Sequence, residues 1–332
     1  MVTTEPTTDR PATPTAPAIR QGRWPESRRE MSFGVMLPIA DLDAISNQSV
    51  GLGFHDMVEM GRLAVEVGFE ALWLPDHFIL KLEREGNQAR GVWECWTTCA
   101  GLAASIPEAT IGALVACTSF HNPASIAKMA ENVDEISGGR FILGLGCGWH
   151  QAEYEMYGFP FDHRVSRFEE ALAVISPLVR EGEVTFSGRY YQANQAVNYP
   201  AGPRRAEGGP PILIGANKPR MMRLTARYAD IWNSDWQRDP ATVVEQMAAL
   251  DDACIEVGRD PASLIRTGGS NFALEGNSGR RFEPIEGSVE EMAAAILQFQ
   301  ALGLRHYVCG LDPCTPRTLE HFAKVLEAVD RG

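Results

Sequence analysis

Residues 111–146 read IGALVACTSFHNPASIAKMAENVDEISGGRFILGLG, and this stretch predicts the fold. Two apolar runs without polar alternation, Ile111–Ala116 and Phe141–Gly146, are typical of parallel strands buried on both faces. Between them, apolar residues recur at helical spacing: Ile126, Met129, Val133 and Ile136. Asn122 precedes Pro123, which places a capping side chain before a proline at the first helical position. The stretch is therefore predicted to be a strand–helix–strand unit.

The same alternation recurs along the chain. The other strand candidates are Phe33–Pro38, Ala71–Pro75, Ile212–Gly215, Asp230–Trp232, Thr267–Phe272 and His306–Gly310. Eight strands, each followed by a helical segment, in a chain of 332 residues predict an α/β fold, a closed (β/α)8 or TIM barrel. An open doubly wound sheet is the alternative, but no GxGxxG motif follows the first strand and opens a helix.

Three segments exceed ordinary loop lengths, and we interpret them as loop insertions of the barrel: Lys81–Val92, Gly182–Gly209 and Glu275–Gly287. The second is predicted to contain a hairpin with strands Val184–Ser187 and Tyr190–Gln192. Because long loops in compact domains are often functional lids, we expect all three on the active face.

Residues 1–30 contain six Thr, five Pro and three Ala with almost nothing apolar, which predicts a disordered tail. Residues 31–332 are predicted to form a single barrel domain, and Met31 is a candidate start residue. Arg28-Arg29 is followed by no apolar segment, so we do not interpret the pair as an export signal.

The chain carries 43 acidic and 30 basic residues, which gives a formal net charge of −13. This charge argues against binding to duplex nucleic acid or to anionic membranes, because both need a cationic face. Seven cysteines without a CxxC pair favour a reduced protein over a disulfide scaffold. No apolar run reaches the roughly 18 residues of a membrane span. We therefore expect a cytoplasmic protein that acts on a small molecule.

The residues after each predicted strand are candidates for the site, because barrel enzymes carry their chemistry at the carboxyl ends of the strands. Asp76 and His77 follow the second strand, where an imidazole could transfer protons near neutral pH or simply cap a loop. The third strand is followed by residues that could line a ligand ring: Cys117, Thr118, Ser119 and His121. A small core residue is the alternative interpretation of Cys117.

Glycines and a tryptophan follow the fourth strand. Gly146 and Gly148 would let a ligand approach the backbone, and Trp149 could stack on a flat ring or pack against a loop. The fifth strand leads into a helix through Gly215, Ala216, Asn217 and Lys218. The N–H groups of that helix start, with Lys218 and Arg220 close by, favour an anion site; an ordinary turn is the alternative.

Together these segments resemble the bacterial luciferase-like superfamily of flavin and deazaflavin enzymes, from about Met31 to the C-terminus. The matching stretches are Gly68–Phe78, Asn122–Met129, Ile136–Trp149, Ile214–Asn217 and Ala229–Asn233, with Gly182–Tyr191 similar to the family's hairpin insertion. Pro-Asp-His after the second strand, His-Asn-Pro after the third and Gly-x-Gly-Trp after the fourth are similar to the branch that uses the deazaflavin coenzyme F420.

The resemblance implies a TIM barrel that holds F420 at the carboxyl ends of its strands, in a homodimer. It places His77 and Asp76 beside the reactive edge of the ring, with His77 as the proton-handling catalytic residue, held by Asp76 or by backbone. It also implies a non-prolyl cis peptide within Ala113–Ala116 that backs the ring. The residues expected to bind the cofactor are Asp76, His77, Ala113, Leu114, Val115, Ala116, Thr118, Asn122, Gly146, Gly148, Trp149, Gly215, Ala216, Asn217 and Lys218.

Trp149 stands where the superfamily's deazaflavin sugar-phosphate dehydrogenases carry a catalytic glutamate, so we do not expect a sugar-phosphate substrate. Trp149, Trp93 and Trp96 are expected to wall an apolar substrate pocket. Trp93 and Trp96 stand three residues apart, which is also the spacing of plain core residues on a helix.

The predicted function is hydride transfer between C5 of F420 and a small organic substrate. Within the same class, the alternative is an FMN-dependent luciferase-like monooxygenase. A metal-dependent barrel hydrolase would need His or carboxylate ligands from several strand ends, but the first, fifth and sixth strands end without His, and we expect no metal. A non-catalytic flavin-binding protein is the last alternative.

Overall fold

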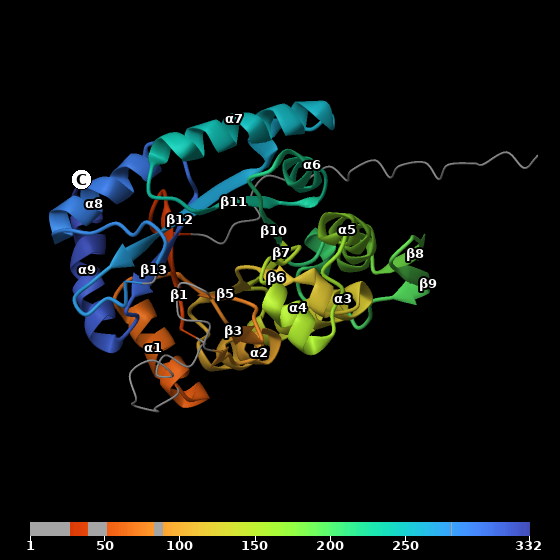
Figure 1. Cartoon of the computed structure of the whole chain (residues 1–332), viewed down its shortest axis with the longest axis horizontal. Helices are drawn as coiled ribbons and strands as arrows, with labels where there is room; N and C mark the ends of the chain where they lie inside the picture. The colour runs from red at the N-terminus through yellow and green to blue at the C-terminus, as the bar shows by residue number, and fades with distance from the viewer. Residues whose placement is uncertain (1–26, 39–51, 83–88, 280) are drawn as a thin grey trace, which may run out of the picture.

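A computed structural model describes residues 27–38, 52–82, 89–279 and 281–332 of the chain (Figure 1). The described residues form a closed barrel of eight parallel strands, in which β13 pairs with β1 and β10 pairs with β7. In barrel order the strands are β1 (Ser32–Met36), β2 (Ala71–Leu74), β5 (Thr110–Ala113) continued by β6 (Ala116–Cys117), β7 (Phe141–Gly146), β10 (Ile212–Gly215), β11 (Ile231–Trp236), β12 (Ile265–Ala273) and β13 (His306–Asp312). The predicted TIM barrel is confirmed, and the open sheet is excluded.

Helices follow the strands and cover the barrel from outside (Figure 1). They are α1 (Phe54–Glu66), α2 (Cys95–Ser105), α3 (Pro123–Ser137), α5 (Arg164–Arg180), α6 (Pro219–Tyr228), α7 (Pro240–Glu256), α8 (Val289–Gln300) and α9 (Pro316–Arg331), with a short extra helix α4 (Gln151–Tyr157) after β7. The predicted start at Asn122-Pro123 is confirmed, because the side chain of Asn122 accepts a hydrogen bond from the Ala124 N–H. Helix α8 begins with a capping box between Ser288 and Glu291. Among the described residues, no helix is long and apolar enough to cross a membrane.

Trp73 fills the interior of the barrel. A Cβ atom added at Gly34 or Gly112 would lie 2.5 Å or 2.3 Å from its ring, so both neighbouring strands need glycine there. The Trp73 Nε1–H donates to Nε2 of His306 at 2.9 Å, and Nδ1 of His306 lies 2.7 Å from Oγ of Ser32. Burial lowers the pKa of His306 to about 3. Ser32 and His306 begin β1 and β13, so this group closes the amino end of the barrel and leaves the carboxyl end for a site.

The third barrel strand is interrupted by a cis peptide bond between Leu114 and Val115, inside the predicted window. The side chain of Val115 lies against β7, where a Cβ atom at Gly146 would stand 2.6 Å from its Cγ2 atom. Gly146 therefore makes room for Val115. The contact of Gly146 with a cofactor stays a prediction.

The hairpin insertion consists of β8 (Glu183–Ser187) and β9 (Gln192–Val197) and lies beside α5 (Figure 1). Its second strand starts two residues later than predicted. Glu170 of α5 accepts the N–H groups of residues 189–191 and holds them in the turn. The whole segment leaves the C-terminal end of α5 and leads into β10, so both its ends lie at the amino end of the barrel. The expectation that it lies on the active face is wrong.

Two short strands, β3 (Ile79–Leu80) and β4 (Arg90–Gly91), pair within the first long loop after β2. Most of the predicted tail, residues 1–26, lies outside the described residues, but residues 27–30 belong to the fold. Arg29 donates to both carboxylate oxygens of Asp330 at 2.6 and 2.7 Å and to the carbonyl of Gly68 at 2.8 Å. Arg29, predicted as part of the tail, is therefore bonded to the barrel.

Candidate functional site

His77 follows β2 at the carboxyl end of the barrel and pairs with Glu153 of α4. Nδ1 of His77 lies 2.8 Å from Oε2 of Glu153, and the side chains are 13% and 1% exposed. The other Glu153 oxygen, Oε1, accepts the backbone N–H groups of Phe78 at 2.6 Å and Ile79 at 3.1 Å. Glu153 thus joins the loop after β2 to the segment after β7 and fixes the orientation of the His77 ring.

Two further rings surround His77. Trp149 packs on it edge to face at a centroid distance of 5.6 Å, and the His150 ring lies 6.2 Å away. Nε2 of His150 accepts the N–H of Lys81 at 3.1 Å, and burial lowers the pKa of His150. Nε2 of His77 has no hydrogen-bond partner within the described part of the chain. Trp149 itself is 57% exposed. His77 is therefore oriented through one nitrogen while the other stays free for a ligand.

Asp76 is buried beside the third strand. Its Oδ2 accepts the N–H of Cys117 at 2.8 Å, and its Oδ1 has no partner among the described residues. Burial raises the pKa of Asp76 to about 7. The expectation that Asp76 holds His77 is wrong, because Nδ1 of His77 is held by Glu153 and the hydrogen bond of Asp76 goes to Cys117. Asp76 instead ties the loop after β2 to Cys117, the last residue of β6.

The small residues after the third strand pack within the protein. Cys117 Sγ lies 3.1 Å from Oη of Tyr154, and burial raises the pKa of Cys117 to about 12. Thr118 is buried, and its hydroxyl donates to the carbonyl of Gly146 at 3.2 Å. Cys117 is therefore a core residue. Asn122 has a structural task as the N-cap of α3.

Gly148 has a positive φ of 73°, and a Cβ atom there would lie 1.9 Å from the Tyr154 hydroxyl. That hydroxyl donates to the carbonyl of Cys147 at 2.9 Å. Gly148 is therefore required by its backbone conformation and by Tyr154, which packs where a side chain would stand.

The start of α6 has the uncapped N–H groups and the nearby cation that an anion site requires. Its N-cap residue, Lys218, is exposed and forms no side-chain cap, and Pro219 begins the helix. Arg220 is engaged by α5, because it pairs with Glu169 at 2.7 Å. Gly215 is open, since a Cβ atom there would meet only Val115 Cγ1, at 3.9 Å. The carbonyl of Ala216 accepts the Trp232 indole N–H at 2.8 Å. Lys218 and the uncapped N–H groups therefore remain for a ligand.

The other two predicted pocket tryptophans differ from each other. Trp93 is 54% exposed and donates its indole N–H to the carbonyl of Leu52 at 2.7 Å. Trp96 is 4% exposed and packs against Phe141 at a centroid distance of 6.1 Å. Trp96 belongs to the hydrophobic core, which agrees with the alternative interpretation of this residue as a core residue.

The sequence interpretation gave Glu153 no role. The signal for it is weak, because α4 has only seven residues. The partner of His77 emerges only when the barrel brings the ends of β2 and β7 together.

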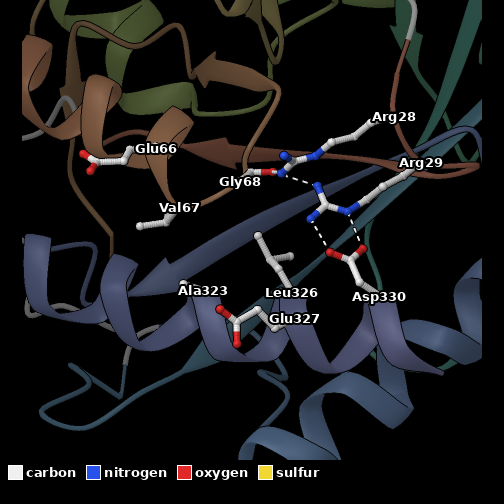
Figure 2. A pocket seen from close by; sticks show the side chains of 9 residues that line it. All are labelled: Arg28, Arg29, Glu66, Val67, Gly68, Ala323, Leu326, Glu327 and Asp330. Atoms are coloured by element: carbon white, nitrogen blue, oxygen red, sulfur yellow. Dashed lines mark hydrogen bonds and ion pairs between the residues drawn. The ribbon is translucent and has the colours of Figure 1, made fainter.

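A hollow at the opposite end of the barrel takes no part in this site. It lies between the C-terminal ends of α1 and α9, and Figure 2 shows Arg28 and Arg29 on one side and Asp330 on the other. Both arginines donate to the carbonyl of Gly68, at 3.2 and 2.8 Å. This arrangement fastens the residues before β1 to the last helix.

Comparison with known proteins gives a consistent picture. The sequence profile described as luciferase-like monooxygenase matches residues 31–278. Phthiodiolone/phenolphthiodiolone dimycocerosates ketoreductase of Mycobacterium tuberculosis is 31% identical over 258 residues, which are 73% of this chain and 65% of that protein. The chain thus spans less than two thirds of the ketoreductase.

Two further matches name F420. F420-dependent glucose-6-phosphate dehydrogenase of Microbacterium testaceum is 30% identical over 212 residues, which are 62% of this chain and 60% of that protein. Among solved structures, an F420-dependent secondary alcohol dehydrogenase in complex with an F420-acetone adduct superposes with a TM-score of 0.75. It is 18% identical and covers 91% of this chain and 99% of its own, so it shows the shared fold.

Proposed function

We propose, because the chain belongs to the luciferase-like monooxygenase family, that it is an F420-dependent oxidoreductase that transfers a hydride to or from a small organic substrate. The observation that carries the proposal is the hydrogen bonding of the two ring nitrogens of His77. Its Nδ1 is fixed by Glu153, while its Nε2 has no partner among the described residues. A ring nitrogen of this kind can give or take the proton that accompanies a hydride.

The residues at the carboxyl end of the barrel fit the cofactor. Leu114, Val115 and Trp236 are partly buried there and pack over the interior cluster that contains Trp73, so they offer an apolar surface to a flat ring. The absence of a Cβ at Gly215 leaves the backbone at the end of β10 open. The uncapped start of α6, with Lys218, suits a phosphate.

When bound, F420 supplies a two-electron hydride donor or acceptor. The chain supplies orientation and proton transfer. Leu114 and Val115 would support one face of the ring, and the N–H groups at the start of α6 would bind the phosphate. In the direction of carbonyl reduction, Nε2 of His77 would donate a proton to the substrate oxygen; in the direction of alcohol oxidation it would accept one. The exposed indole of Trp149 would shield this transfer from water.

The substrate we propose is an alcohol or a carbonyl compound with an apolar body, because the exposed indole of Trp149 packs against His77. A glutamate there would favour a polar or cationic group, whereas an indole favours apolar surface. The family resemblance further suggests a homodimer, which light scattering on the purified protein would test.

The test is a panel of secondary alcohols and ketones, assayed anaerobically with F420 or its reduced form. Interconversion of the oxidised and reduced absorption spectra with at least one apolar substrate supports the proposal. Failure with every substrate, together with oxygen consumption in the presence of reduced FMN, would instead favour a flavin monooxygenase.

A further inference from the structure

We infer that Glu153 is a positioning residue that holds His77 in one tautomer, with the proton on Nδ1 and the lone pair on Nε2. The tautomer follows from contacts within this chain. Its consequence, that Nε2 is the atom that exchanges a proton with substrate, rests on the proposed function.

All groups that face the Glu153 carboxylate are N–H donors or a ring nitrogen. Oε1 accepts two backbone N–H groups, those of Phe78 and Ile79, and Oε2 faces Nδ1 of His77. A proton on Oε1 would have no acceptor, because a backbone N–H only donates. The remaining choice is therefore whether the shared proton sits on Oε2 or on Nδ1.

The contacts favour the proton on Nδ1. In that state Glu153 is a carboxylate that accepts three N–H hydrogen bonds, and bonds to an ionised acceptor are about twice as strong as neutral ones. Such bonds compensate the burial of the charge. The other titratable groups facing the pair are Asp76, next to His77 in the chain, and His150, whose ring lies 6.2 Å away. Nδ1 keeps its proton whether the ring is neutral or cationic, so only Nε2 changes protonation.

A purely structural role is the competing explanation. Glu153 would then serve only to bind the loop after β2 through Phe78 and Ile79, and the tautomer of His77 would not depend on it. Glu153→Gln separates the two roles because it is isosteric. The Gln carbonyl oxygen must accept the two backbone N–H groups, so its NH2 group faces Nδ1 as a donor. Nδ1 then has to become the acceptor, which moves the ring proton to Nε2.

The experiment is nitrogen-15 NMR of histidine-labelled protein without cofactor. His77→Asn assigns the His77 signals, and Glu155→Gln is the matched control, because Glu155 is an exposed residue of the same helix. We expect a protonated Nδ1 in wild type and in the control, and a protonated Nε2 in Glu153→Gln. A wild-type ring protonated on Nε2, or an unchanged tautomer in the folded Gln variant, would overturn the inference. The wild-type spectrum alone remains decisive if the Gln variant does not fold.

A kinetic experiment separately tests whether Nε2 of His77 exchanges a proton with the substrate. At saturating F420 and substrate, Glu153→Gln should lower kcat for alcohol oxidation by about 10²-fold, because Nε2 no longer offers a lone pair. Combined with His77→Asn it should add little, since both changes remove the same function. A switched tautomer with wild-type kcat would leave the NMR result intact and would remove His77 from the proposed reaction. Failure of F420 to bind would refute the proposed function without touching the tautomer.

Discussion

Oε2 of Glu153 lies 2.8 Å from Nδ1 of His77, although the two residues are separated by 76 positions in the chain. Glu153 is 1% exposed in its side chain, and its second oxygen is held by backbone N–H groups of the loop that carries His77. The orientation of the His77 ring is thus set by a residue from a different strand end. This relationship makes His77, rather than Asp76, the first residue to test.

His77→Asn should lower kcat by roughly 10²–10⁴-fold at saturating cofactor, because the amide can form hydrogen bonds but cannot act as an acid or base near neutral pH. Cofactor affinity should change far less, since the apolar surface at Leu114 and Val115 and the start of α6 are unaltered. Steady-state kinetics across pH checks this, with His321→Asn, on the outer helix α9, as the control. Near-wild-type kcat with an unchanged pH profile would exclude His77 from proton transfer.

Asp76 should make stability depend on pH. Burial raises its pKa from 3.8 to about 7, so its carboxyl group binds a proton more tightly in the folded than in the unfolded chain. That contribution is complete below about pH 4 and is lost as pH rises through about 7. Asp76→Asn keeps an acceptor for the Cys117 N–H and does not ionise. Its free energy of unfolding relative to wild type should therefore rise between pH 4 and 8, by on the order of 4 kcal/mol.

Urea denaturation of both proteins without cofactor, at several pH values, measures this difference. His306, whose pKa lies at about 3, titrates with the opposite sign but is present in both proteins and cancels. A difference that stays constant with pH would mean that Asp76 does not titrate in this range.

Lys218→Ala should weaken F420 binding about fivefold, or about 1 kcal/mol, and reduce the dependence of binding on salt. The reason is that Lys218 stands at the uncapped start of α6, where a phosphate would accept N–H groups. Turnover at saturation should change little. Lys324→Ala, on α9, is the charge-matched control. If binding and its salt dependence equal those of wild type, the phosphate does not bind at this helix.

Deletion of residues 1–30 should cost about 1–2 kcal/mol of stability relative to deletion of residues 1–26. The shorter deletion keeps Arg29 and its hydrogen bonds to Asp330 and Gly68, while the longer one removes them (Figure 2). Thermal unfolding of the two truncated proteins, with Arg29→Ala in the full chain as a third sample, measures the difference. Equal melting temperatures would show that the Arg29–Asp330 pair does not stabilise the barrel.

The sequence predicts the barrel well because its strands are short apolar runs and its helix starts carry local caps, as at Asn122 and Ser288. The cis peptide at Leu114-Val115 also lies in the window that the family resemblance implies. What the sequence does not predict depends on packing between distant segments. The contact of Glu153 with His77 depends on the position of α4. The need for glycine at position 146 depends on the side chain of Val115.

Other features that the sequence does not predict have the same origin. Trp93 and Trp96 share one segment, but only the fold decides that the first is exposed and the second is buried. Arg29 belongs to a stretch of low apolar content, yet the C-terminal helix provides Asp330 as its partner. Interactions between residues close in sequence can thus be predicted from the sequence, whereas pairs distant in sequence, such as Arg29 and Asp330, cannot.

Cofactor choice tests the central claim most directly. Purified protein without cofactor would be titrated with F420 and with FMN under identical conditions, and binding would be followed by fluorescence. The account predicts that F420 binds at least about tenfold more tightly, or about 1.4 kcal/mol, and that the bound form exchanges a hydride with an alcohol or ketone. Equal affinities, or tight binding of FMN with substrate-dependent oxygen consumption, would contradict it.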